Sequence, residues 1–137
     1  MALPKPEIGL VIRLAYLWSH DYYEGRSEAS KDRPCVIVSC TNEGRVFVFP
    51  ITHSSPREAD TAIELPPRVK AHLGLDEAPS WIIIDECNSF DWPGYDMRPM
   101  ASGRFDYGHL PPRLFDRIRQ AVAKKIQINS LKITPRT

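Results

Sequence analysis

The sequence predicts an α+β fold, in which a small, strongly bent antiparallel sheet or barrel is combined with a short helix and a C-terminal helix. About five or six short strand-like runs are separated by turns and polar loops, which is typical of strands joined as hairpins. These runs do not alternate regularly with long helices, so a doubly wound α/β fold is not expected. The one long amphipathic pattern lies near the end of the chain, at residues 111–126.

The strands are predicted from runs rich in β-branched, aromatic and other apolar residues. They are expected at residues 8–18, 34–40, 45–51, 61–65, 81–85 and, as a short addition, 98–103. The second and third of these are joined by Asn42-Glu43-Gly44, which predicts a β-hairpin. Residues 81–85, WIIID, are apolar on both faces, which predicts a central strand of the sheet that ends in Asp85.

Two proline pairs, Pro66-Pro67 and Pro111-Pro112, mark the expected helix starts, because the first turn of a helix leaves the missing proline N–H without cost. The first helix is expected to close near Gly74. The second helix places apolar residues at helical spacing, which predicts that it covers one face of the sheet. These apolar residues are Leu114, Phe115, Ile118, Val122 and Ile126.

Polar segments between these elements are expected to be loops. Residues 19–32 and 52–60 are predominantly polar, and residues 86–97 contain Trp92-Pro93-Gly94. A loop as long as residues 19–32 is unusual in a compact domain unless it has a function. Residues 127–137 are weakly patterned and are expected to form a frayed tail.

The length of 137 residues favours one domain, residues 1–137, with a core over about residues 8–126. The formal net charge is +1, which argues against a basic coat over the whole surface. Any contact with RNA would therefore depend on a local basic patch.

The sequence favours a cytoplasmic protein. No apolar run approaches the roughly 20 residues needed to span a bilayer, and the first ten residues lack the apolar stretch of a secretory signal. The three cysteines, Cys35, Cys40 and Cys87, lack the paired spacing of a zinc site, and we expect reduced, at least partly buried thiols.

Arg33-Pro34 is the most informative local feature, because it places a guanidinium where a charged turn enters the predicted hairpin. Arginine offers five N–H donors in a rigid fork and stays charged at any working pH. A polar segment that begins Thr52-His53-Ser54 follows the other strand of the hairpin. This combination suits recognition of a phosphate group.

The order of these motifs resembles the MazF/PemK family of toxins from type II toxin–antitoxin modules, from about Gly9 to Ile126. Ser27-Glu28 lies in the first long loop, with the glutamate five residues before Arg33. Pro50-Ile51-Thr52 ends the third strand, and Asp85-Glu86-Cys87-Asn88 follows the core strand. The segment from Asn88 to Pro99 resembles a PemK-like subgroup.

The resemblance implies an SH3-like antiparallel barrel of the MazF/PemK/CcdB type and a homodimer. It further implies a metal-independent, sequence-specific endoribonuclease that needs no cofactor and is neutralised by a cognate antitoxin. Attack by the RNA 2′-hydroxyl would leave a 2′,3′-cyclic phosphate. Arg33 would be central to this reaction, Thr52 would bind a phosphate oxygen, and Glu28 or Asp85 would orient the arginine or act as a base.

Each of these residues also has an ordinary structural interpretation. Arg33 could form an ion pair with Asp32, Glu28 or Asp85, and the Thr52 hydroxyl could cap a turn. Glu28 could be a solvated loop residue. The pKa of Asp85 would fall beside Arg33 and would rise if the carboxylate stood alone in a dry site.

The candidates for RNA binding are His20, His53, Ser54, Asn88 and Arg98. The two histidines lie in the predicted loops that flank the groove, and either could exchange a proton near neutral pH. Arg98, or equally Arg104, could supply a phosphate contact. Exposed aromatic residues could stack on bases, and the candidates are Tyr22, Tyr23 and Trp92, although Trp92 could instead pack beneath its own turn.

The chain departs from the family pattern at two positions. Asn88 stands where an arginine is often found, and Ile83 stands where some members carry a further arginine. These departures leave a second interpretation open, in which the barrel is a non-catalytic module that binds a peptide, a protein or a nucleic acid. A toxin directed at a protein such as a topoisomerase is a variant of that interpretation.

Overall fold

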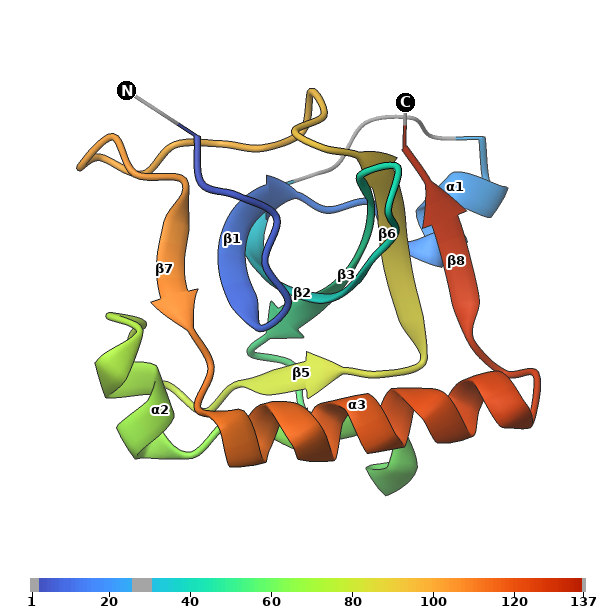
Figure 1. The fold of residues 1–137 in the computed structure, drawn as a ribbon. Coiled ribbons are helices and arrows are strands. Elements are labelled where there is room, and N and C mark those ends of the chain that lie inside the picture. Colours follow the sequence, from blue (N-terminus) through green and yellow to red (C-terminus); the bar gives the residue numbers. More distant parts are fainter. Residues whose placement is uncertain (1–2, 26–30, 137) are drawn as a thin grey trace.

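The structure, a computed structural model, describes residues 3–25 and 31–136. Eight strands form one strongly bent sheet, and the long helix α3 (Pro112–Gln127) runs across it (Figure 1). The pairs are antiparallel except for the pair between β6 (Glu86–Asp91) and β8 (Lys132–Pro135). This architecture confirms the predicted α+β class.

The centre of the sheet is a meander of three strands, which are β1 (Leu10–Ala15), β2 (Asp32–Cys40) and β3 (Arg45–Thr52). In the register of β2 with β3, Val36 lies opposite Phe49, so the predicted hairpin is confirmed. The hairpin turn ends at Gly44, whose φ of 86° lies in the region that favours glycine.

The edge of β3 that faces away from β2 is divided between two partners, and this division bends the sheet. Its first half pairs with β6, and its end pairs with β5 (Trp81–Ile83). Outside β5 lies β4 (Ala62–Glu64), and β7 (Asp106–His109) pairs with β1 at the other edge.

Short helical elements connect the strands: α1 (Ser19–Tyr23), the 3-10 turn η1 (Ala59–Thr61) and α2 (Pro67–His72). Both α2 and α3 begin at a proline, as predicted. On α3, Phe115, Ile118 and Val122 are buried against the sheet. Ile126 differs from the prediction, since it is 60% exposed near the end of the helix.

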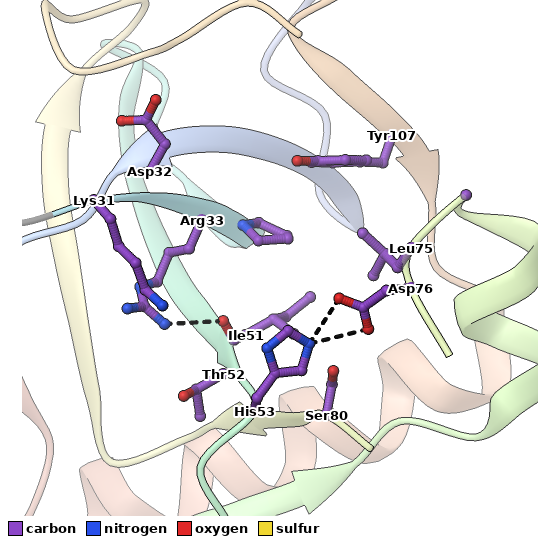
Figure 2. Close-up of a pocket in the computed structure, with 12 residues that line it drawn as sticks. Lys31, Asp32, Arg33, Ile51, Thr52, His53, Leu75, Asp76, Ser80 and Tyr107 are labelled. Atoms are coloured by element: carbon purple, nitrogen blue, oxygen red, sulfur yellow. Dashed lines mark hydrogen bonds and ion pairs between the residues drawn. The ribbon is translucent and has the colours of Figure 1, made fainter. Parts of the chain in front are cut away.

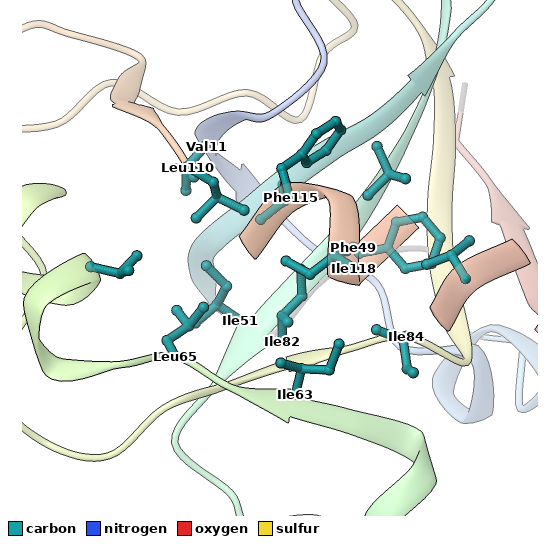
Figure 3. Close-up of a cluster of buried hydrophobic side chains, with 14 of the residues drawn as sticks. Val11, Phe49, Ile51, Ile63, Leu65, Ile82, Ile84, Leu110, Phe115 and Ile118 are labelled. Carbon is teal, nitrogen blue, oxygen red and sulfur yellow. The ribbon is translucent and has the colours of Figure 1, made fainter. Parts of the chain in front are cut away.

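The core consists of two apolar clusters on opposite faces of the central strands. Figure 3 shows the first cluster, in which Phe49 and Ile82 of the sheet pack with Ile118 of α3. The second cluster includes Ile12, Ile37 and Phe90. Adjacent side chains of a strand point to opposite faces, so neighbouring apolar residues of one strand supply both clusters.

Four segments differ from the prediction. Residues 19–32 contain the short helix α1, and residues 86–97 begin with strand β6. Residues 98–103 form no strand, and β7 follows them. Residues 132–135 are not frayed, because their backbone pairs with β6 and Thr134 is buried. Polar residues occupy buried positions in both β6 and β8, so neither strand shows the apolar pattern from which strands are predicted.

Candidate functional site

Arg33 lies on β2 and is buried, with 9% of the residue exposed. Its Nη1 donates a hydrogen bond to the carbonyl oxygen of Ile51 at 3.4 Å, and its Cζ lies 4.9 Å from the ring centroid of Trp18. Its Nε is buried without a hydrogen-bond partner. Burial lowers the pKa of Arg33 because it removes water from the guanidinium.

No described carboxylate neutralises this guanidinium. Asp32 faces other arginines instead: it lies 3.6 Å from Arg13 and 4.0 Å from Arg98. Asp85 forms no ion pair with Arg33 within the described ranges 3–25 and 31–136, and Glu28 lies outside these ranges. The ion pairs of Arg33 with Asp32 and Asp85 that the sequence allowed are therefore not formed.

Thr52 follows Ile51 at the end of β3 and is 9% exposed. Its Oγ1 accepts a hydrogen bond from the Ser54 backbone N–H at 3.2 Å, so the hydroxyl does stabilise the turn. The hydroxyl proton is not used in this contact. Thr52 can therefore support the loop and still donate to a ligand in the groove.

A groove of about 540 Å³ lies beside these residues and gathers most of the predicted site. The predicted residues that line it are Arg33, Thr52, Asp85, His20, His53 and Ser54. Sequence reasoning missed Trp18, Lys31 and Glu86, which also line it. Ile83 contributes an apolar wall where some family members carry an arginine.

A second hollow of about 300 Å³ adjoins the first, as shown in Figure 2. Lys31, Arg33, Thr52 and His53 line both hollows. Tyr107 forms part of the wall of the second hollow. Arg33 therefore stands between two connected parts of one groove, and the exposed Lys31 adds a second positive charge.

His53 is held by Asp76, an acidic residue that no sequence motif marks. Its Nε2 lies 3.0 and 2.9 Å from the two carboxylate oxygens of Asp76, and Lys70 Nζ lies 2.8 Å from the same carboxylate (Figure 2). The hydrogen bonds from Lys70 and His53 lower the pKa of Asp76 to about 2. Asp76 is therefore a carboxylate at any working pH.

The other acidic residues of the groove differ in their surroundings. Burial raises the pKa of Asp85, which lies in the link between β5 and β6. Glu86 is held in place: its carboxylate accepts hydrogen bonds from Tyr16 Oη at 3.0 Å, Ser19 N at 3.1 Å and Ser19 Oγ at 3.2 Å. Burial raises the pKa of Tyr16 well above its ordinary value, so the phenol stays protonated and donates.

Asn88 does not face the groove and is fully buried. Its Oδ1 accepts from the Leu17 N–H at 2.9 Å, and its Nδ2 donates to the Leu17 carbonyl at 2.7 Å. The amide joins β6 to the segment between β1 and α1, so we remove Asn88 from the candidates for RNA binding. An amide suits this position because it can accept from the N–H and donate to the C=O of the same residue.

Arg98 also lies outside both hollows. Its Nη1 donates to the carbonyl oxygens of Tyr95 at 2.7 Å and Met97 at 3.2 Å. Arg104 pairs with Asp106 at 2.9 Å. These two arginines therefore serve local structure, and neither takes the position of the missing arginines beside Arg33.

The three aromatic candidates for base stacking, Tyr22, Tyr23 and Trp92, line neither hollow. Trp92 stacks on Phe90 with ring centroids 6.3 Å apart, which agrees with a packing role. Tyr22 and Tyr23 are exposed on α1 but line neither hollow. Trp18 is the aromatic residue beside Arg33, and nothing in the local sequence marks it, because the contact joins the segment between β1 and α1 to strand β2.

Two features are absent from the part of the chain that the structure describes. No group of three or more histidine, cysteine, aspartate or glutamate side chains is placed to hold a metal ion. No described helix has both the length and the apolar character needed to cross a bilayer.

The bent sheet, the C-terminal helix and the groove around Arg33 define a small α+β protein with a site suited to an anionic ligand. A family model described as PemK-like, MazF-like toxin of type II toxin-antitoxin system matches residues 16–126. The chain therefore belongs to this family, which confirms the resemblance inferred from its motifs and implies an antitoxin as partner. A search of the curated proteins finds no match to the chain.

Proposed function

We propose that this chain is a toxin that cleaves single-stranded RNA at specific sequences without a metal ion. The observation that carries the proposal is the state of Arg33, a buried guanidinium that lines a groove and has no described carboxylate partner. A buried charge without a counterion is costly unless a ligand supplies the opposite charge. A phosphodiester of RNA has the charge and the acceptor oxygens that this fork of donors requires.

Metal-free cleavage requires charge stabilisation and two proton transfers. Arg33 stabilises the negative charge that develops on phosphorus, and Thr52 donates to one phosphate oxygen. Asp85 accepts the proton of the 2′-hydroxyl, since its raised pKa makes it a stronger base than an ordinary aspartate. The products are a 2′,3′-cyclic phosphate and a 5′-hydroxyl end. Glu28 remains a candidate for orienting Arg33.

The remaining polar residues of the groove bind the strand on either side of the reacting phosphate. His20, His53 and Ser54 line it together with Lys31, so its local charge attracts RNA although the whole chain carries only +1. An acidic segment of the antitoxin would compete for the same surface. A homodimer, acting in the cytoplasm where its RNA substrate is found, completes the proposal.

The second candidate function is a non-catalytic module that binds a peptide or a protein in this groove. Ile83 favours it, because an apolar side chain in the wall of the groove can neither bind phosphate nor transfer a proton. Arg33 favours cleavage, since no carboxylate within residues 3–25 and 31–136 neutralises it and a peptide-binding groove would not need a buried guanidinium directed at an anion.

The test is incubation of the purified protein with a long RNA of mixed sequence in the presence of EDTA. The nuclease proposal expects discrete cuts by the wild type, none by Arg33→Ala, and unchanged cutting by Arg113→Ala on the exposed face of α3. Absence of cutting by the wild type over many sequences would favour the binding module.

A further inference from the structure

We propose that His53 is the general acid of this reaction, and that Asp76, itself anchored by Lys70, is the residue that positions it. The inference rests on the proposed RNA cleavage and assigns a role that Arg33, Thr52 and Asp85 leave open. Those three residues account for charge stabilisation and for removal of the 2′-hydroxyl proton. They provide no group that protonates the departing 5′-oxygen.

The geometry of His53 fits that missing role. One ring nitrogen, Nε2, is held by both oxygens of Asp76 at 2.9 and 3.0 Å. The other, Nδ1, lies on the side of the ring that faces Arg33 (Figure 2). Because Nε2 is engaged, the protonated ring releases a proton from Nδ1, into the groove that His53 shares with the guanidinium proposed to hold the phosphate.

Asp76 is itself fixed in position, although it is exposed. Lys70, which is 4% exposed, approaches the carboxylate with Nζ at 2.8 Å and also donates to the carbonyl oxygen of Ala78. The Ala78 N–H donates to the same carboxylate at 3.1 Å. A carboxylate held against Nε2 restricts the rotation of the ring and fixes which of its nitrogens faces Asp76. This resembles the way an acidic residue orients a catalytic histidine in general.

His53 suits this role better than His20, the other histidine of the groove. His53 follows Thr52 directly and lines both hollows, whereas His20 lines only the larger one. The carboxylate beside His20 comes from Asp21, its neighbour in the chain, at 3.4 Å. The partner of His53 comes from the distant loop between α2 and β5, so the contact between them is set by the fold.

The reaction balances with these groups. The 2′-oxygen forms a bond to phosphorus while its proton passes to the Asp85 carboxylate. The bond from phosphorus to the 5′-oxygen breaks, and that oxygen takes the proton from His53 Nδ1. Asp85 ends protonated and His53 neutral, and exchange with water restores both. The RNA is divided without any oxidant, reductant or external nucleophile.

The experiment uses an oligonucleotide that contains a mapped cleavage site, prepared with either the normal 5′-oxygen or a bridging 5′-sulfur at the reacting phosphate. A thiolate leaves without being protonated, so it does not require a general acid. We expect His53→Gln to slow cleavage of the normal substrate by about 10²–10⁴-fold. We expect the same variant to cleave the sulfur substrate at close to the wild-type rate.

Asp76→Asn tests the positioning role. It should slow the normal substrate less than His53→Gln does, and it should also be rescued by the sulfur substrate. His72→Gln is the matched control, because this exposed histidine of α2 lines neither hollow. Thermal unfolding of each variant checks that it is folded.

The inference is overturned if His53→Gln cleaves the normal substrate at the wild-type rate, or if it is equally slow on both substrates. In either case the wild type still cleaves RNA, and the proposed function stands. Failure of the wild type to cleave either substrate would remove the proposed function and this inference together. Rescue of Arg33→Ala by the sulfur substrate would also overturn it, since the effect would not be specific to the general acid.

Discussion

The guanidinium of Arg33 lies over the ring of Trp18, with Cζ 4.9 Å from the ring centroid. The ring of Trp18 in turn meets Tyr16 edge to face, with ring centroids 5.0 Å apart. The aromatic face covers one side of the cation without using any of its N–H donors. Arg33 is thereby held in place while its donors remain available to an anion.

Replacement of Arg33 by methionine should abolish RNA cleavage without lowering the free energy of unfolding. Methionine keeps an unbranched stem beside Trp18 and removes a buried charge that has no described counterion. Urea unfolding measures the stability, and inorganic phosphate is a probe of the site. Phosphate should raise the Tm of the wild type and leave that of Arg33→Met unchanged.

A clear loss of stability in Arg33→Met would mean that Arg33 has a structural partner that this account lacks. An equal effect of phosphate on both proteins would show that the ion binds elsewhere. Arg113→Met, on the exposed face of α3, serves as the control for loss of one positive charge.

Trp18→Leu should weaken catalysis by loosening Arg33. A desolvated cation–π contact is worth about 2 kcal/mol, which corresponds to a loss of about 10–30-fold in kcat/KM. Steady-state cleavage of a mapped site measures this loss. Trp92→Leu is the matched control, because Trp92 stacks on Phe90 and lines neither hollow. Equal losses in the two variants would contradict a specific role for Trp18.

Asn88→Ala should destabilise the fold. The change leaves the buried N–H and C=O of Leu17 without partners, at about 1–3 kcal/mol for each group. We expect the free energy of unfolding in urea to fall by about 2–4 kcal/mol. Asn42→Ala, in the exposed hairpin turn, should change it little. A variant of normal stability with weakened RNA binding would restore Asn88 to the RNA-binding surface.

Asp85→Asn should be more stable than the wild type at neutral pH and less active. The folded protein raises the pKa of Asp85 above the ordinary value of 3.8, so folding favours the protonated form. The stability of the wild type therefore falls as pH rises from about 3.8 through the raised value. The difference in free energy of unfolding between Asp85→Asn and the wild type should therefore disappear when the pH is lowered below that range.

Urea unfolding of both proteins between about pH 3 and 7 follows this difference. A difference in stability that does not change with pH would show that ionisation of Asp85 is not its cause. If the wild type instead became more stable than Asp85→Asn as the pH rises, the folded protein would stabilise the carboxylate.

The parts of the fold that the sequence predicted well are those with a strong local pattern. The hairpin of β2 and β3 and the helix α3 have clear apolar periodicity and turn residues. Strand β6 was missed because Asn88 and Ser89 are polar and yet buried. Their side chains are satisfied by partners far along the chain, which a local pattern cannot reveal.

The residues of the candidate site likewise include some that the local sequence could predict and some that it could not. Arg33, Thr52 and His53 could be selected because they flank the predicted hairpin. Asp76 and Trp18 could not, since Asp76 is 23 positions from His53 and Trp18 meets Arg33 only through the pairing of β1 with β2. Residues that hold a functional side chain are often distant in sequence, and only the fold shows which ones they are.

The chemical nature of the RNA ends distinguishes attack by the 2′-hydroxyl from hydrolysis by water. The wild type and Arg33→Met are incubated in EDTA with RNA of mixed sequence, and the new 5′ ends are labelled by a polynucleotide kinase without prior phosphatase treatment. We expect the wild type to create 5′-hydroxyl ends that accept label, matched by 2′,3′-cyclic phosphates, and Arg33→Met to create none. New ends that carry a 5′-phosphate, or equal cutting by both proteins, would contradict this expectation.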